Sequence, residues 1–136
     1  MKKVITFGTF DLFHLGHLRI LERARALGDY LVVGVSTDQL SFSKKNYLPV
    51  FSECNRMNIV RAIRYVDEVF REESLEKKRE YIRQHRADVL VMGEDWKGKF
   101  DVYSDLCEVV YLERTVGVST TDLKRFIKSV PGEKEL

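Results

Sequence analysis

The sequence lacks the features that mark several large classes of protein. Its 136 residues include only two cysteines, Cys54 and Cys107, too few for a disulfide framework and without the Cys/His spacing of a zinc site. We therefore expect both to be small buried side chains in a reducing compartment. No apolar run is long enough to span a membrane, and the stretch before Gly8 is too short for an export signal. These absences predict a cytoplasmic protein without membrane insertion.

An excess of charge of one sign is also missing. Lysine and arginine total 23, aspartate and glutamate total 21, and the net charge is +2. This near-neutral balance argues against nucleic acid as a partner, but it is compatible with a local cationic pocket for a small phosphate. No linker, internal repeat or low-complexity segment divides the chain. We expect one domain over residues 1–130, followed by a short tail over 131–136.

What the sequence does contain is a repeated alternation of strand-like and helix-like segments. Helical spacing of apolar residues predicts helices after the first strand, after Ser52, from Ser74 to His85 and from about Thr120. The last helix is expected to bury Leu123, Phe126 and Ile127. The polar stretch 37–49 has no periodicity and is expected to be a loop. Short β-rich segments are predicted at 4–7, 30–35, 66–70, 88–92 and 108–112.

This alternation predicts the fold class. Strands that alternate with helices form right-handed crossovers, which give a mostly parallel sheet with helices on both faces. We therefore expect an α/β protein with a single Rossmann-like domain built on five strands. Ligands of such sheets bind at the carboxyl ends of the strands. Functional residues are expected after Phe7, Val35, Met92 and Leu112.

The segment that joins the first strand to the first helix has the strongest functional signal. His14 and His17 lie three residues apart around Gly16, at the start of a helix, so both imidazoles can face one ligand. The free N–H groups of a helix N-terminus favour phosphate, and Thr9 adds a hydroxyl. A single histidine here would more simply cap the helix or pack against the loop. No third metal ligand is evident nearby, and neither G-x-G-x-x-G nor a Walker A loop is present.

These residues resemble a known family. The segments 8–11 and 14–17 are similar to the paired signature of the cytidylyltransferase branch of the nucleotidylyltransferase superfamily. Over essentially the whole chain, the order and spacing of motifs resemble the bacterial glycerol-3-phosphate cytidylyltransferases. One departure is Glu94, where that family usually has aspartate. The further segments that carry the resemblance are Lys44, Arg64–Val69, Gly93–Trp96 and Arg114–Thr121.

The resemblance implies an activity and its substrates. The reaction would convert CTP and glycerol 3-phosphate to CDP-glycerol and pyrophosphate by in-line transfer, supplying synthesis of teichoic acid or a related cell-wall polymer. The acceptor phosphate is already ionised, so alignment and charge stabilisation would suffice without a strong general base. A divalent ion, expected to be Mg²⁺, would be held mainly by triphosphate oxygens, with no metal-ligating residue assigned. The family also implies a homodimer, the commonest oligomer.

The resemblance also implies roles for individual residues. The catalytic residues would be His14, His17, Lys44 and Arg114, and the acceptor would contact Lys44 and Lys78. The implied nucleotide-binding residues are Thr9, Phe10, His14, Gly16, His17, Gly93, Asp95, Trp96, Arg114, Thr115, Gly117, Ser119 and Thr120.

Simpler interpretations stay open for several of these residues. Lys78 lies in a charged run of the kind that usually forms a solvated helix face. Trp96 could instead be a core residue or a subunit contact. Ser119 and Thr120 could cap the last helix without any ligand. Arg56 and Arg64 could pair with nearby carboxylates, such as Glu53 and Asp67, and act only in structure.

The function has alternatives as well. The chain could be a cytidylyltransferase for another small phosphate, such as phosphoethanolamine, or an adenylyltransferase on the same fold. It could also be a nucleotide-binding regulatory module without turnover.

Overall fold

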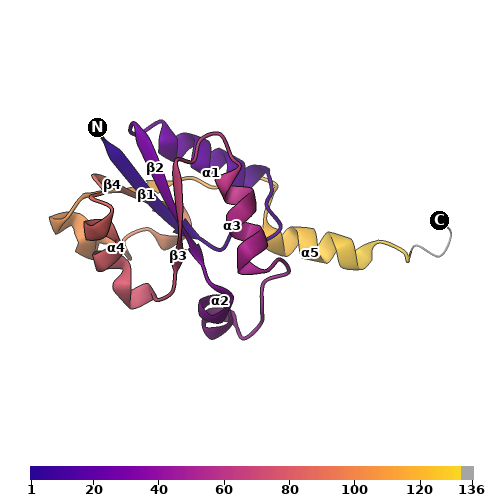
Figure 1. Cartoon of the computed structure of the whole chain (residues 1–136). Helices are drawn as coiled ribbons and strands as arrows, with labels where there is room; N and C mark the ends of the chain where they lie inside the picture. The colour runs from indigo at the N-terminus through magenta and orange to yellow at the C-terminus, as the bar shows by residue number, and fades with distance from the viewer. Residues whose placement is uncertain (133–136) are drawn as a thin grey trace.

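Five parallel strands form a single sheet in the computed structural model, which describes residues 1–132 (Figure 1). The strand order is β3-β2-β1-β4-β5, and all four pairings are parallel. The chain therefore builds outward from β1 first to one side and then to the other, which confirms the predicted α/β fold class. The strands are β1 (Lys3–Gly8), β2 (Tyr30–Ser36), β3 (Glu68–Glu72), β4 (Val89–Gly93) and β5 (Glu108–Leu112).

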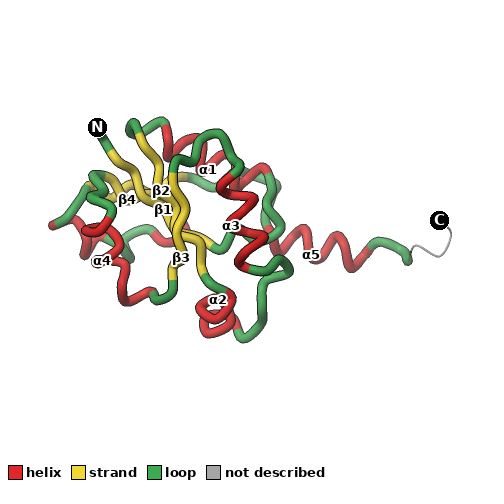
Figure 2. The backbone as a smooth tube through the Cα atoms, viewed as in Figure 1, coloured by secondary structure: helices red, strands yellow, loops and turns green. Residues whose placement is uncertain are grey.

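Helices cover both faces of the sheet (Figure 2). On one face α1 (Leu15–Arg25) and α3 (Glu53–Arg61) bury Leu21 and Val60 against the side chains of alternate strand residues. On the other face α4 (Lys78–Gln84) buries Tyr81 and Ile82. Because both faces are covered, the central strands are apolar at nearly every position, as β2 shows. The remaining elements are α2 (Asp38–Lys45), α5 (Thr120–Ser129) and 3₁₀ turns at Leu75–Lys77, Glu94–Trp96 and Asp101–Asp105.

The expectation of a loop over residues 37–49 is wrong, because α2 occupies most of it. The helix begins at Thr37, whose hydroxyl oxygen accepts the Leu40 N–H at 3.1 Å. It ends at Asn46, which adopts a left-handed conformation with φ of 62°. Only Leu40 and Ser41 of this helix are buried. A two-turn helix with so little buried surface leaves no apolar period in the sequence.

The predicted buried face of the last helix is also wrong. Ser119 caps α5 as expected, but Phe126 is 67% exposed and Ile127 is 60% exposed. Figure 1 shows the reason: only the beginning of α5 lies against the body, and the rest projects away from it. Of the expected tail over residues 131–136, residues 133–136 lie outside the described residues.

Three smaller expectations need correction. Cys54 is exposed on the outer side of α3 and Cys107 is half-buried, so the two thiols are not both core residues. The third strand begins later than expected, at Glu68. Ser74 caps the 3₁₀ turn that precedes α4 rather than α4 itself. Within residues 1–132, no helix has both the length and the apolar character needed to cross a membrane.

Candidate active site

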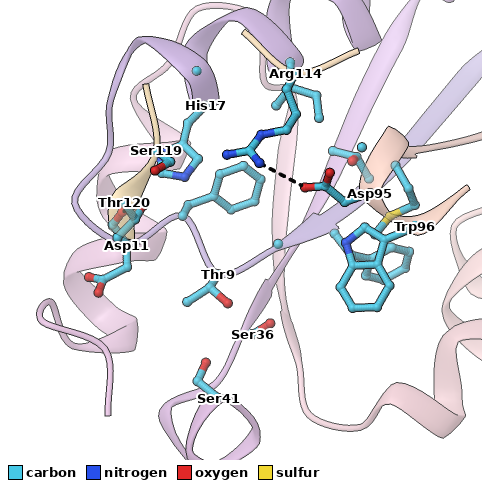
Figure 3. Close-up of a pocket in the computed structure, with 18 of the residues that line it drawn as sticks. Thr9, Asp11, His17, Ser36, Ser41, Asp95, Trp96, Arg114, Ser119 and Thr120 are labelled. Carbon is cyan, nitrogen blue, oxygen red and sulfur yellow. Dashed lines mark hydrogen bonds and ion pairs between the residues drawn. The ribbon is translucent and has the colours of Figure 1, made fainter. Parts of the chain in front are cut away.

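A pocket of about 780 Å³ opens at the carboxyl ends of the strands (Figure 3). The loop after β1 and the ends of the other four strands all contribute to its walls, together with the start of α5. The order of the strands reverses direction beside β1, so the loops after β1 and β4 diverge there and leave a crevice. This is the edge at which the alternation of elements predicted functional residues.

The structure brings nearly all of the sequence-predicted site residues together in this pocket. Gly117 is the exception: it does not line the pocket, and its φ of 86° identifies it as a turn glycine in the loop before α5. The predicted residues that do line the pocket are Thr9, Phe10, His14, Gly16, His17, Lys44, Lys78, Gly93, Asp95, Trp96, Arg114, Thr115, Ser119 and Thr120.

The two histidines cap α1 reciprocally. The Nδ1 atom of His14 accepts the backbone N–H of Gly16 at 3.0 Å, and the Nδ1 atom of His17 accepts the backbone N–H of His14 at 3.1 Å. Their rings stack with centroids 3.8 Å apart. A neutral imidazole whose Nδ1 accepts a hydrogen bond has its proton on Nε2. Capping, which the sequence offered as the simpler interpretation, therefore leaves both Nε2–H groups free to donate to a ligand.

Both histidines are held in the neutral form. Burial lowers the pKa of His17 from its ordinary value of 6.5 to about 4, with a smaller contribution from neighbouring His14 and an opposing one from Asp11. Burial also lowers the pKa of His14. At neutral pH the pair therefore offers two neutral donors, and the negative charge of a bound polyphosphate would oppose the lowering of their pKa values.

Gly16 is required by the position of the His14 ring. A Cβ atom at residue 16 would lie 2.7 Å from Cε1 and 3.0 Å from Nδ1 of His14. Any other residue would push the imidazole off the Gly16 N–H that orients it. The middle glycine of the His14–His17 segment therefore positions a histidine as well as leaving room for a ligand.

The loop after β1 is held in a strained shape by contacts from distant parts of the chain. Phe10 and Leu12 have φ values of 55° and 49°, in the left-handed region that costs non-glycine residues about 1–2 kcal/mol each. Between them, the buried Asp11 carboxylate accepts the backbone N–H groups of Val50 and Phe51 at 2.8 and 2.9 Å. Thr120 donates its hydroxyl to the Asp11 carbonyl at 3.0 Å. These bonds fasten the loop to the residues before α3 and to the start of α5.

The buried Arg56 side chain also fixes the loop after β1. Its side chain is fully buried and donates to the carbonyl oxygens of Thr9 at 2.9 Å, Ser36 at 2.7 Å and Phe51 at 2.9 Å. Its ion-pair partner is Asp38, at 2.7 Å, and not the expected Glu53, which instead pairs with Arg71. Arg56 thus has the structural role considered for it, and through that role it fixes three loops of the pocket.

Lys44 and Lys78 are joined by a hydrogen-bonded chain along the pocket floor. Lys44 Nζ donates to Ser36 Oγ at 3.2 Å, and Ser36 Oγ donates to Glu72 Oε1 at 3.3 Å. Lys78 Nζ donates to Glu72 Oε2 at 2.6 Å and lies 4.0 Å from the centroid of the Phe7 ring. Burial lowers the pKa of both lysines, and Glu72 opposes that shift. The floor therefore holds two cations around one buried carboxylate.

The structure contradicts the solvated-face interpretation of Lys78 and the core interpretation of Trp96. Lys78 is 2% exposed, so it is not part of a solvated helix face. Trp96 is exposed at the pocket, beside Phe100 and below Lys99, so it is not a core residue. Arg64 packs over the Tyr65 ring, while Asp67 pairs with Arg25.

The wall of the pocket formed by the loops after β4 and β5 carries groups that suit a polyphosphate. Arg114 and Asp95 are both exposed and form a loose ion pair at 3.8 Å, which Figure 3 marks with a dashed line. Such a pair contributes little to stability, so the guanidinium can turn to a phosphate at little cost. Glu94 accepts the Arg114 N–H at 3.5 Å and thus connects the loops after β4 and β5. Ser119 caps α5 and exposes the N-terminus of that helix to the pocket.

The polar pocket residues that sequence reasoning did not assign to the site include Ser36, Ser41, Glu72 and Lys124. Ser36 and Glu72 are the last residues of β2 and β3. The rule that ligands bind at strand ends would have found Glu72, had it also been applied to the third strand. Lys124 reaches the pocket because the beginning of α5 packs there, and no sequence pattern marks that contact. The same is true of Ser41, which lies in the unpredicted α2.

Comparisons with known proteins agree with this geometry. A family model described as cytidylyltransferase-like matches residues 5–130. The chain is 55% identical over 127 residues to the glycerol-3-phosphate cytidylyltransferase of Bacillus subtilis (strain 168), covering 93% of this chain and 98% of that protein. It is 46% identical over 127 residues to the enzyme of the same name from Staphylococcus aureus (strain NCTC 8325 / PS 47), covering 92% and 94%.

A solved structure supports the fold alone. The lipopolysaccharide core biosynthesis protein from Thermoplasma volcanium GSS1 is similar with a TM-score of 0.75 at 24% identity, covering 85% of this chain and 98% of that one.

Proposed function

The chain belongs to the cytidylyltransferase-like family, and on that premise we propose that it is a glycerol-3-phosphate cytidylyltransferase. It converts CTP and glycerol 3-phosphate to CDP-glycerol and pyrophosphate. The observation that carries this proposal is one pocket with two separate sets of donors. The neutral His14 and His17 pair lies at the start of α1. The hydrogen-bonded side chains that join Lys44 to Lys78 lie on the floor of the pocket. A two-substrate reaction on one domain needs both sets in one crevice.

The transfer proceeds by attack of an acceptor phosphate oxygen on the α-phosphorus of CTP. The new P–O bond forms as the bond from the α-phosphorus to the pyrophosphate oxygen breaks. The attacking phosphate is already ionised near neutral pH, so no general base is required. His14 and His17 donate Nε2–H hydrogen bonds to the charge that develops around the α-phosphorus, and Lys44 reduces the repulsion between the two anions.

The nucleotide lies along the wall formed by the loops after β4 and β5. The N-terminus of α5, with Ser119, and the Arg114 guanidinium bind the β- and γ-phosphates. Thr120 contributes its backbone N–H, because its hydroxyl proton is donated to the Asp11 carbonyl. Trp96 and Asp95 lie where the nucleoside is bound.

Magnesium enters this proposal as part of the substrate. Residues 1–132 contain no group of three metal-ligating side chains, and the Asp11 carboxylate is occupied by backbone N–H groups. The described residues therefore offer no group of side chains that would hold the metal by themselves, and Mg²⁺ would be held mainly by triphosphate oxygens of CTP, whose charge it would reduce.

A homodimer in the cytoplasm is the remaining part of the proposal. Phe126 and Ile127 on α5, together with Val130 just after it, are not covered by any other part of residues 1–132, and this apolar surface supports contact with a second copy. Sedimentation equilibrium is expected to give the dimer mass. The double variant F126S/I127S should shift the protein to monomer, and an unchanged dimer would exclude this face. The CDP-glycerol formed is expected to supply teichoic acid or a related cell-wall polymer.

Pyrophosphate release tests the activity directly. CTP and Mg²⁺ are incubated with glycerol 3-phosphate, ribitol 5-phosphate, phosphoethanolamine or phosphocholine in turn. The highest kcat/KM is expected with glycerol 3-phosphate. Turnover of another acceptor alone would refute the substrate assignment, equal use of ATP would refute the cytidine assignment, and binding of CTP without turnover would indicate a regulatory module.

A further inference from the structure

One buried polar group in the pocket has no partner in the protein. Ser41 is 2% exposed, and in residues 1–132 its Oγ is the one buried side-chain nitrogen or oxygen without a hydrogen bond. Leaving a buried hydroxyl unpaired costs free energy, so such groups are uncommon unless a ligand or ion completes them. Ser41 lines the active-site pocket, and Figure 3 shows its hydroxyl directed toward the side on which Ser36 and Thr9 lie.

The usual local partner of a helical serine is not used here. Serine within a helix can donate to the carbonyl four residues earlier, which for Ser41 is that of Thr37. That carbonyl accepts the backbone N–H of Ser41 at 2.9 Å, and the hydroxyl makes no bond to it. Ser43, on the same helix, shows the contrast, since its hydroxyl donates to the Leu40 carbonyl at 2.7 Å and does not line the pocket.

The surrounding polar groups are already paired. Ser36 Oγ accepts from Lys44 and donates to Glu72, while Glu72 also accepts from Lys78. Ser41 therefore has a buried hydroxyl with a proton still to donate and lone pairs still to fill.

The position of Ser41 relates it to the acceptor rather than to CTP. Lys44 follows Ser41 by three residues on α2, so both side chains lie on the same side of the helix. If Lys44 holds the acceptor phosphate beside the α-phosphorus, the carbon chain of the acceptor extends from that phosphate past Ser41. The α-phosphorus is expected beside His17. In Figure 3, Thr9 lies between His17 and Ser41, so Ser41 is on the side of the pocket away from the α-phosphorus.

We propose that Ser41 binds a hydroxyl group of the polyol phosphate acceptor and thereby selects acceptors with a hydroxyl on the carbon chain. This inference rests on the proposed function. A hydroxyl both donates and accepts, which matches the unused capacity of Ser41. An ammonium group at the same place would lie near Lys44, one turn along the same helix, whose positive charge disfavours it.

The test compares S41A and S41C with wild type and with the control S43A. With glycerol 3-phosphate, S41A and S41C are expected to raise the acceptor KM about tenfold or more, with the CTP KM unchanged. S43A should behave as wild type. Because the Ser41 hydroxyl has no partner in the protein, S41A should melt no lower than wild type, so a loss of activity cannot be attributed to unfolding.

Two deoxy acceptors separate a hydroxyl contact from a phosphate contact. 3-Hydroxypropyl phosphate lacks the secondary hydroxyl of glycerol 3-phosphate, and 2-hydroxypropyl phosphate lacks the terminal one. The penalty of S41A should disappear with one of them. An unchanged acceptor KM in S41A, or a full penalty with both analogues, would overturn the role of Ser41 while the proposed function stands.

The two proposals fail in different ways. If wild type uses another polyol phosphate in place of glycerol 3-phosphate, the substrate assignment fails and the same S41A penalty is still expected on that acceptor. If wild type uses only an acceptor without a hydroxyl, such as phosphocholine, both proposals are refuted.

Discussion

Replacing His17 by asparagine should separate the two roles that its imidazole performs. Asparagine Oδ1 occupies the place of histidine Nδ1, so H17N can still accept the His14 N–H that His17 accepts at 3.1 Å. It has no group at the position of Nε2, which is the donor proposed for the α-phosphorus. H17N therefore keeps the cap and loses the donor, whereas H17A loses both.

The expected magnitudes follow from these contacts. Loss of a cap costs about 1 kcal/mol, so H17A should unfold more easily by about that amount and H17N should not. Removal of one preorganised donor to developing charge costs about 10²–10³-fold in turnover, and both variants should show this loss. Urea unfolding and pyrophosphate release measure the two quantities on the same preparations.

The pH dependence of stability gives a second measure of His17. The folded side chain stays neutral down to about pH 4, while in the unfolded chain it takes up a proton near its ordinary pKa of 6.5. The unfolded state therefore binds more protons between these values, and stability falls as the pH drops through that window. A shift of this size corresponds to about 3 kcal/mol. We therefore expect the difference in free energy of unfolding, wild type minus H17N, to decrease by about 3 kcal/mol between pH 7 and pH 4.

Two results would refute this account of His17. Turnover of H17N close to that of wild type would show that Nε2 does not act on the reacting phosphate. A difference between wild type and H17N that is independent of pH would show that the folded histidine is not held neutral by burial.

The remaining predictions concern the ring of His14 and the buried ion pair. G16A should lower kcat/KM about 10–100-fold, because its Cβ displaces the His14 imidazole, and wild-type kinetics in G16A would contradict that steric conflict. K78M should destabilise the fold by about 3–5 kcal/mol in chemical unfolding, because it leaves the buried Glu72 carboxylate without its cationic partner. The double variant K78M/E72Q should recover most of that stability while the acceptor KM stays high, and equal stability of K78M and wild type would exclude a buried pair.

Local patterns in the sequence were sufficient for the parts of the site that lie close together in the chain. His14, Gly16 and His17 form one turn of helix after a strand, so their spacing alone predicted a shared ligand. Ser119 was predicted as a cap for the same local reason, and the structure confirms that cap. The order of strands and helices likewise predicted the parallel sheet and the edge at which the pocket lies.

Packing between distant segments could not be predicted in this way. Phe126 and Ile127 have the spacing of a buried helix face, yet they are exposed because α5 leaves the body after its first turn. Lys78 looked like part of a solvated run, yet it is buried because β3 places Glu72 beside it. A periodic pattern records which residues share a face, and it does not record whether another part of the chain covers that face.

The scarcity of cysteine and the near-neutral charge excluded classes of protein, and short-range spacing determined the elements and the histidine pair. Only the tertiary structure decided how those residues act. It showed that His14 and His17 cap one another and so leave neutral Nε2–H donors, that Arg56 fixes three loops at once, and that Ser41 has an unpaired hydroxyl in the pocket. The physical reason is that burial and hydrogen-bond completion depend on segments brought together by folding.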